Sequence, residues 1–319
     1  MTIPTPSPIK IGVSTCLMGE KVRYDGNHKH DRYITDTLGR FFRFVPVCPE
    51  VECGLPVPRE AMGLERDGEA VRLVTNKSRV DHTERMLAWC AKRVKELEQE
   101  DLCGFIFKKN SPSSGLYNVK VHARGMPTKA GRGLFANAVT EHFPLLPVEE
   151  EGRLHDMVLR ENFIERVFAY RRWKDLVAGG KTVGRLVEFH TVHKLLIMAH
   201  SPERYREMGN LVAHGREMPR DEFFSRYQEL FMKALALHAT VRKNADVLQH
   251  IAGHFKRELT REEKAELQEV IGEYHQRLVP LIVPVTLPRH YVRKYGRDYL
   301  LKQVYLSSTP QELMLRNHV

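Results

Sequence analysis

Residues 11–16, Ile-Gly-Val-Ser-Thr-Cys, form an apolar, strand-like run that ends on a cysteine. Residues 44–48, Phe-Val-Pro-Val-Cys, repeat this pattern. A third apolar run, Gly-Phe-Ile-Phe-Lys at 104–108, leads into the serine-rich loop Ser-Pro-Ser-Ser-Gly at 111–115. In an open α/β sheet, ligands bind at the carboxyl ends of the strands. Two thiols carried there by separate strands predict a metal or cluster site, with serines in the third loop.

Strand-like and helical segments alternate over the first half of the chain, which predicts a mainly parallel sheet with helices on its faces. The expected strands are 9–15, 42–47, 71–75 and 104–109, and the expected helices are 30–40, 82–99 and 130–142. Helical periodicity dominates after that, and the expected helices there are 154–177, 183–199, 203–214, 219–239, 243–258 and 260–278. We therefore expect an α/β domain over residues 1–150, ending in a linker at 143–152, and an all-α helical bundle over residues 151–319.

Basic charge is concentrated in the second half of the chain. Residues 1–152 carry 22 Lys and Arg against 20 Asp and Glu, whereas residues 153–319 carry 28 against 20 and also hold 11 of the 16 histidines. A basic domain of this kind suggests a polyanionic partner, with nucleic acid favoured, although basic surfaces are also common without one.

The N-terminal residues favour a cytoplasmic protein, and the cysteines do not form a disulfide pattern. All five lie in the first third of the chain, and an odd number at irregular spacing argues against a disulfide framework. Cys90 falls in a helical run and is expected to be a small buried hydrophobe. No stretch approaches the roughly 20 apolar residues of a membrane span, and residues 1–9 lack a hydrophobic signal core. We expect no membrane partner.

Short motifs give the chain a family resemblance. In order over residues 9–150 they are Ser-x-Cys-Leu-x-Gly, Val-Arg-Tyr-Asp-Gly, Val-Cys-Pro-Glu-Val, Gly-Leu-Pro-x-Pro-Arg and Lys-x-x-Ser-Pro-Ser-x-Gly. Together they resemble the thiouracil desulfurase (TudS) family. The second half, with segments such as 190–194, 198–202, 244–255 and 312–317, resembles the YbgA-like domain. The fused arrangement resembles proteins assigned as tRNA 4-thiouridine desulfidases.

The resemblance implies a [4Fe-4S] cluster held by three cysteines, with one iron left open. The sulfur of a thiolated uracil would bind this iron, water would add to the ring carbon, and sulfide would be released without electron transfer. Glu50 corresponds to the acid of the Cys-Pro-Glu motif and is expected to be the base that activates water or moves protons. Ser111 is expected to assist proton transfer or position the substrate. The other expected substrate contacts are Arg23, Tyr24, Asp25, Ser113 and Ser114.

From the residues alone, several of these positions also have ordinary structural interpretations. Cys16 and Cys48 can be buried cysteines at a turn and at a strand end. Glu50 can be a solvated loop carboxylate, and Ser111 can be a hydroxyl that initiates a turn.

Ser114 departs from the family pattern. The family loop reads Ser-Pro-Ser-Cys-Gly, and a serine alkoxide is a poor ligand for a soft cluster. We expect Cys16 and Cys48 as two ligands and Cys53, five residues beyond Cys48 on the same loop, as the third. The alternatives are Cys103, which precedes the third strand, or no third thiol at all.

In the helical domain, His190, His193 and His200 fall on one helical face. They could ligate a metal, but we favour hydrogen bonds within the bundle or contacts with phosphate. The candidates for contact with RNA are Lys194, Arg204, Arg242, Lys243, Lys256 and Arg257.

The leading interpretation is an iron-sulfur-dependent, non-redox desulfidase that converts 4-thiouridine in tRNA to uridine. One alternative is a desulfidase acting on free thiouracil. A second, of a different class, is an RNA-binding or sensor protein whose cluster has become structural or has been lost. A zinc-bound hydrolase is the third.

Overall fold

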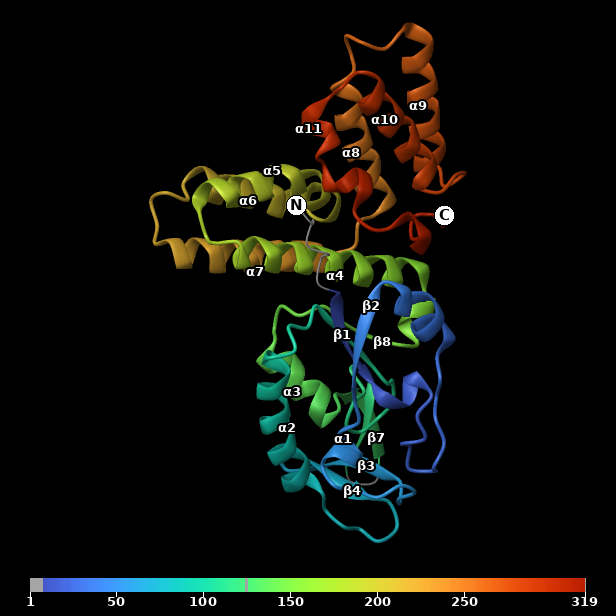
Figure 1. The fold of residues 1–319 in the computed structure, drawn as a ribbon. Coiled ribbons are helices and arrows are strands. Elements are labelled where there is room, and N and C mark those ends of the chain that lie inside the picture. The colour runs from blue at the N-terminus through green and yellow to red at the C-terminus, as the bar shows by residue number, and fades with distance from the viewer. Residues whose placement is uncertain (1–7, 124–125, 319) are drawn as a thin grey trace, which may run out of the picture. The chain divides into compact units, whose positions relative to one another are not determined.

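The computed structural model describes residues 8–123 and 126–318 and divides into two compact units, one ending at Asp156 and the other beginning at Met157 (Figure 1). The first unit combines strands and helices, and the second consists of helices. The expected fold class is therefore confirmed. In the part of the chain that the structure describes, no helix has the length and apolar character that crossing a membrane requires.

A four-stranded parallel sheet forms the centre of the first unit. Its strands are β1 (Ile9–Ser14), β2 (Phe42–Val47), β5 (Gly104–Phe107) and β8 (Val148–Glu150), in the order β2-β1-β5-β8. Every residue of β5 is buried, as expected for an inner strand covered on both faces. Because β1 pairs with both β2 and β5, the carboxyl ends of these three strands lie together.

The aromatic core requires glycine in β1. A Cβ at Gly12 would overlap the ring of Phe105 on the neighbouring strand. The Phe105 ring stacks on Phe107, with centroids 4.2 Å apart, and meets Phe135 edge-on at 5.7 Å. Phe135 belongs to α3 (Leu134–His142), so this cluster joins the sheet to a covering helix.

The segment expected to be a linker instead contains a strand of the sheet. Strand β8 pairs with β5, and Glu149, Glu150 and Glu151 are buried. Burial of carboxylates is tolerated here because they are paired. Arg153 Nε lies 2.7 Å from Glu149, and Lys108 Nζ lies 2.6 Å from Glu151. The run of acidic residues is therefore structural.

A second sheet was not expected from the sequence. It has the order β4-β3-β6-β7, with β3 (Met62–Asp67), β4 (Ala70–Thr75), β6 (Val119–Ala123) and β7 (Met126–Gly131). The expected strand at 71–75 is present, but it pairs antiparallel with β3 rather than joining the parallel sheet. Because β7 occupies 126–131, the helix expected from residue 130 begins only at Leu134.

The helices of the first unit agree in part with expectation. Helix α2 (Thr83–Glu98) matches the expected 82–99. The expected helix at 30–40 is instead a π-helical turn over Tyr33–Thr37 followed by a 3-10 turn over Leu38–Arg40. In Figure 1, α2 and α3 run side by side, and the rings of Trp89 and Phe135 lie 5.2 Å apart between them.

The second unit contains eight α-helices in the described residues. They are α4 (Met157–Ala178), α5 (Val183–His200), α6 (Pro202–Ala213), α7 (Arg220–Ala236), α8 (Val241–Gly253), α9 (Arg261–His275), α10 (Ile282–Lys294) and α11 (Asp298–Leu301). Thr260 and Glu263 form a capping box at the start of α9. The first six correspond to expected helices, whereas α10 and α11 were not expected.

His190 and His193 hydrogen-bond inside the bundle, as we favoured. His190 Nδ1 lies 3.2 Å from the Tyr227 hydroxyl. His193 Nδ1 donates to the Phe189 carbonyl at 2.7 Å, because a carbonyl oxygen can only accept. The other ring nitrogen, Nε2, is then the acceptor for Arg172 Nε at 3.1 Å. In the described residues there is no group of three or more His, Cys, Asp or Glu side chains that could hold a metal ion.

His200 belongs to a buried charge network. Its Nδ1 lies 2.6 Å from the Leu237 carbonyl and its Nε2 lies 2.8 Å from Glu165. Since a carbonyl and a carboxylate both accept, the ring fits best as an imidazolium that donates twice. Arg316 Nη2 contacts the other oxygen of Glu165 at 3.2 Å. Burial alone would raise the pKa of Glu165, but the two cationic partners hold it well below its usual range.

The neutral histidines predict a loss of stability in acid. Burial lowers the pKa of His190 to about 4 and that of His193 to about 3, against 6.5 for an unperturbed histidine. Between pH 6.5 and 4 the unfolded chain therefore binds more protons than the folded one, so stability falls as pH falls. Each histidine contributes up to about 1.4 kcal/mol per pH unit.

Denaturant unfolding of wild type and His190→Phe at pH 6.5, 5.5 and 5.0 measures this effect. We expect a shallower dependence of the unfolding free energy on pH in the variant. Equal slopes for the two proteins would contradict the assignment of His190 as a neutral, buried group.

Candidate functional site

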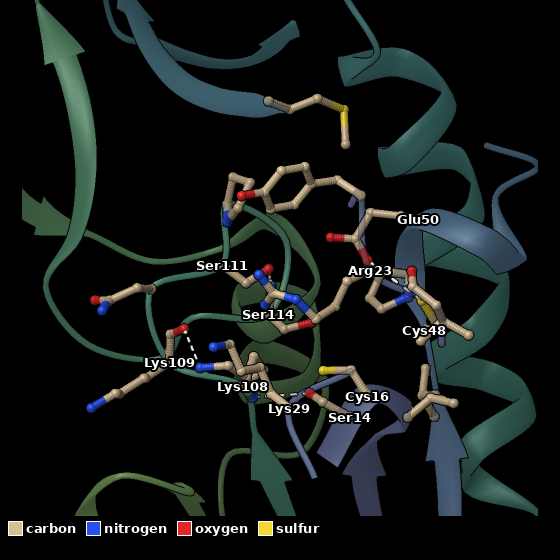
Figure 2. A pocket seen from close by; sticks show the side chains of 18 of the residues that line it. Ser14, Cys16, Arg23, Lys29, Cys48, Glu50, Lys108, Lys109, Ser111 and Ser114 are labelled. Atoms are coloured by element: carbon tan, nitrogen blue, oxygen red, sulfur yellow. Dashed lines mark hydrogen bonds between the residues drawn. The ribbon is translucent and has the colours of Figure 1, made fainter. Parts of the chain in front are cut away.

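Three strand ends and the loops that follow them surround a cavity of about 340 Å³ (Figure 2). A 3-10 turn, Thr15–Met18, follows β1 and carries Cys16. Cys48 follows β2 and is the N-cap of the short helix α1 (Pro49–Glu52). The serine-rich loop 111–115 follows β5. The polar and thiol side chains that line the cavity are Ser14, Thr15, Cys16, Arg23, Tyr24, Lys29, Cys48, Glu50, Arg59, Lys108, Lys109, Asn110, Ser111 and Ser114.

Cys16 and Cys48 are buried thiols that share this cavity. Burial raises the pKa of Cys16 to about 11, with Lys108 opposing the shift. Burial and the nearby Glu50 carboxylate raise the pKa of Cys48 to about 12. Both side chains are therefore neutral thiols at pH 7 in the protein alone, and a bound cation would be needed to make them thiolates.

Glu50 is held in place by groups from three parts of the chain. The Ser113 hydroxyl donates to Glu50 Oε1 at 2.6 Å. On the other oxygen, Arg59 Nη2 lies at 3.8 Å and the Cys48 thiol at 3.7 Å. Figure 2 shows Glu50 beside Cys48, with Ser111 and Ser114 across the cavity from them. The carboxylate is thus oriented toward the thiols while one of its oxygens stays close to a cation.

The serine loop is held by its own side chains and by glycines. Ser111 Oγ accepts from the backbone N–H of Ser113 at 3.3 Å and of Ser114 at 3.1 Å. A Cβ at Gly115 would contact the Ser111 carbonyl, and one at Gly133 would overlap the backbone of Ser113. Ser114, where the family pattern has cysteine, is 3% exposed and lines the cavity.

Only some of the expected substrate contacts line the cavity. Arg23 and Tyr24 line the cavity, and the Arg23 guanidinium lies 5.4 Å from the centroid of the Tyr24 ring. Asp25 is not among the lining residues. Its carboxylate contacts Arg23 Nε at 3.3 Å and accepts from the Asn27 N–H at 3.1 Å, which closes the turn. Ser113 does not line the cavity, and its hydroxyl instead donates a hydrogen bond to Glu50.

Cys53 is not among the residues that line the cavity. Its Sγ lies 3.3 Å from the Glu50 carbonyl, and burial together with the Glu50 carboxylate raises the pKa of this thiol. Cys103 precedes β5 and is fully buried at the amino end of that strand. The cavity therefore offers two thiols and the hydroxyl of Ser114. This donor set suits a soft metal centre in kind but is one thiol short of three, and Cys53 as the third ligand stays a prediction.

Apart from Arg23, the basic side chains at the cavity were not selected from the sequence. Lys29, Lys108 and Arg59 all line it. Arg59 ends the Gly-Leu-Pro-x-Pro-Arg motif, so its place in that motif could have identified it. Lys108 likewise begins the Lys-x-x-Ser-Pro-Ser-x-Gly motif. Lys29 carried no comparable signal, because only the turn of residues 19–30 brings it here.

The six candidates for contact with RNA fall into two groups. Lys194 lies over the Tyr299 ring, Arg204 pairs with Glu207, and Lys243 donates to backbone carbonyls. These three have structural partners. The exposed candidates, for which the structure gives no ion pair in the described residues, are Arg242, Lys256 and Arg257.

Both parts of the chain match known protein families. The 2-thiouracil desulfurase family model matches residues 11–151, and a model described as a protein of unknown function, DUF1722, matches residues 194–310. The uncharacterized protein YbgA of Escherichia coli K12 is 29% identical over 153 residues, which are 48% of this chain and 90% of that protein. The uncharacterized protein YbbK of Bacillus subtilis 168 is 34% identical over 114 residues, which are 33% of this chain and 75% of that protein.

A solved structure described as the [4Fe-4S]-dependent thiouracil desulfidase TudS is 31% identical, covers 46% of this chain and 94% of its own, and has a TM-score of 0.38. The family models and the curated relatives agree with the motifs found in the sequence. This chain belongs to the 2-thiouracil desulfurase family through its first unit and continues into a YbgA-like DUF1722 region.

Proposed function

We propose that this protein is a desulfidase that replaces the sulfur of 4-thiouridine in tRNA with oxygen. The observation that carries the proposal is the shared cavity of Cys16, Cys48 and Glu50 at the strand ends of a 2-thiouracil desulfurase family domain. The reaction balances as hydrolysis: a C=S bond and water give a C=O bond and hydrogen sulfide. Neither an oxidant nor a reductant is consumed.

Cys16 and Cys48 would hold a [4Fe-4S] cluster, the cofactor that the family resemblance implies. When bound, such a cluster supplies an open iron, a Lewis acid suited to the sulfur of a thiocarbonyl. The third protein ligand in this proposal is Cys53. Its thiol would have to turn from the Glu50 carbonyl toward the cavity, and α1 is short enough, at four residues, for this loop to rearrange locally.

Glu50 would act as the base. Its Oε1 is hydrogen-bonded to Ser113 and its Oε2 faces Arg59, so the carboxylate is oriented to accept a proton from water attacking the ring carbon. Ser111 lies 3.0 Å from the Ser113 hydroxyl, which gives a short chain of hydroxyls through which a proton can move. Ser113 is therefore proposed as a positioning residue, and Ser111 as a proton carrier or substrate contact.

Arg23 and Tyr24 are proposed to bind the base being desulfurated. Tyr24 is 44% exposed, so its ring is accessible for stacking on uracil. Arg23 can donate to a ring carbonyl or to a phosphate. Asp25 supports both by fixing the turn and the direction of Arg23.

The second unit is proposed to bind the RNA. Over residues 157–319 it carries 27 Lys and Arg against 19 Asp and Glu. Ser114 favours one other candidate function, an RNA-binding or sensor protein with a structural or lost cluster, because this position lacks the family thiol. A substrate assay separates the two.

Sulfide release from 4-thiouridine tRNA, compared with release from free thiouracil, tests the proposed function. We expect stoichiometric conversion of 4-thiouridine to uridine by anaerobically reconstituted protein, with loss of rate on tRNA as salt is raised from 50 to ~200 mM. The rate on free thiouracil should change little with salt. Intact 4-thiouridine after prolonged incubation would overturn the proposal, and release from thiouracil alone would assign the small molecule as substrate.

Replacing Glu50 by Gln removes the proposed base and keeps the size of the side chain. We expect kcat to fall by about 10²- to 10⁴-fold, the usual contribution of a general base. Ser113→Ala should lower kcat less and narrow the pH range of activity, because Glu50 keeps its carboxylate but loses its orienting donor. Iron and sulfide content serve as controls and should match wild type. A Glu50→Gln enzyme with wild-type kcat would exclude this residue as the base.

Single cysteine variants identify the third ligand. After anaerobic reconstitution, Cys16→Ala and Cys48→Ala should lose most of their iron and inorganic sulfide. Cys53→Ala should lose them as well, whereas Cys103→Ala and Ser114→Ala should retain them. Full iron and sulfide in Cys53→Ala would rule out that thiol, and loss in Ser114→Ala would assign the hydroxyl instead.

A further inference from the structure

A second cavity, of about 570 Å³, lies in the helical unit between α10 and the segment that follows residue 305. Its polar lining residues are Thr286, Arg289, His290, Arg293, Ser307, Ser308, Thr309, Gln311, Arg316 and Asn317. Three guanidinium groups and one imidazole line this cavity, and none of its lining residues is acidic. This composition is that of an anion site.

The three arginines differ in how their charges are balanced. Arg316 contacts Glu165 at 3.2 Å and Glu161 at 3.6 Å, so its charge is balanced by carboxylates that do not line the cavity. Arg289 and Arg293 have no carboxylate partner in the part of the chain that the structure describes. The cavity therefore keeps two positive charges that no carboxylate among the described residues balances.

Arg289 and Arg293 are four residues apart on α10 and so lie on one face of the helix. Burial, together with the charges of Arg293 and Arg316, lowers the pKa of Arg289. Like charges held this close repel each other, and an anion between them would relieve that repulsion. When the Gln311 amide is oriented with its oxygen toward Arg289, it accepts from both terminal nitrogens, at 2.5 and 2.7 Å, which fixes the guanidinium at the cavity wall.

Hydroxyl and amide groups complete the cavity. Ser307 and Asn317 are exposed, and Thr309 is half-buried. They add neutral hydrogen-bond donors around the two guanidinium groups. Planar guanidinium forks with nearby hydroxyls match the several acceptor oxygens of a phosphate better than the two of a carboxylate.

We propose that this cavity binds a phosphate group through Arg289 and Arg293. The phosphate can belong to the RNA backbone, in which case the site serves the proposed function and rests on it, or to a free phosphate compound. None of the six candidates chosen from the sequence lines this cavity.

The test compares Arg289→Gln/Arg293→Gln with Arg226→Gln/Lys264→Gln, a control that removes two exposed charges from α7 and α9. Inorganic phosphate is titrated against chloride at equal ionic strength, and the unfolding temperature is followed. Phosphate should stabilise wild type and control but not the cavity variant. Arg293→Gln alone changes an exposed position, so it tests the site even if the double variant folds poorly. It should lose most of the stabilisation by phosphate.

Affinity for an unmodified tRNA transcript, measured over a range of salt concentrations, distinguishes the two sources of phosphate. If the RNA backbone supplies it, the cavity variant should bind more weakly, and the slope of log K against log salt should fall by about one per lost phosphate contact, more than in the control. Unchanged RNA binding with a lost phosphate effect assigns the site to a free phosphate compound. An equal phosphate effect in all proteins overturns the proposal. None of these readouts uses desulfidase activity, so the phosphate site can be refuted or supported independently of the proposed function.

Discussion

The close approach of β1 to β5, with Gly12 facing the Phe105 ring, is the contact on which the first unit depends. It allows β1 to pair with β2 on one side and β5 on the other, so that three loops begin at the same edge of the sheet. Cys16, Cys48 and the serine loop owe their proximity to this pairing. The aromatic cluster around Phe105 then joins the sheet to α3 and keeps that edge rigid.

The strand-end cavity combines two thiols, one carboxylate and several basic side chains. Two buried thiols with raised pKa values lie near a carboxylate, and lysine and arginine side chains line the same space. Ser113 and Arg59 orient the Glu50 carboxylate, the group proposed as the base. Ser114 makes the donor set unusual, since the hydroxyl lies where a soft centre would require a thiol.

Much of the first sheet could be predicted from the sequence, because β1, β2 and β5 are apolar runs ended by turns, and the two thiols follow from them. Strand β8 could not, since it lies in a run of three glutamates, Glu149–Glu151, whose burial depends in part on groups distant in sequence, such as Lys108 beside Glu151. The direction of the Cys53 thiol depends on which side of a four-residue helix it occupies. The sequence did not indicate Arg289 as a binding residue either, because its cavity forms only when α10 packs against the last segment of the chain.

The central claim is that the strand-end cavity holds an iron-sulfur centre on Cys16 and Cys48. A crystal structure of anaerobically prepared protein, with diffraction recorded on both sides of the iron absorption edge, tests it directly. We expect anomalous iron density in the cavity, with the Sγ atoms of Cys16 and Cys48 each bonded to a different iron of the cluster. Iron located elsewhere, or fully iron-loaded protein with neither thiol coordinated, would contradict it.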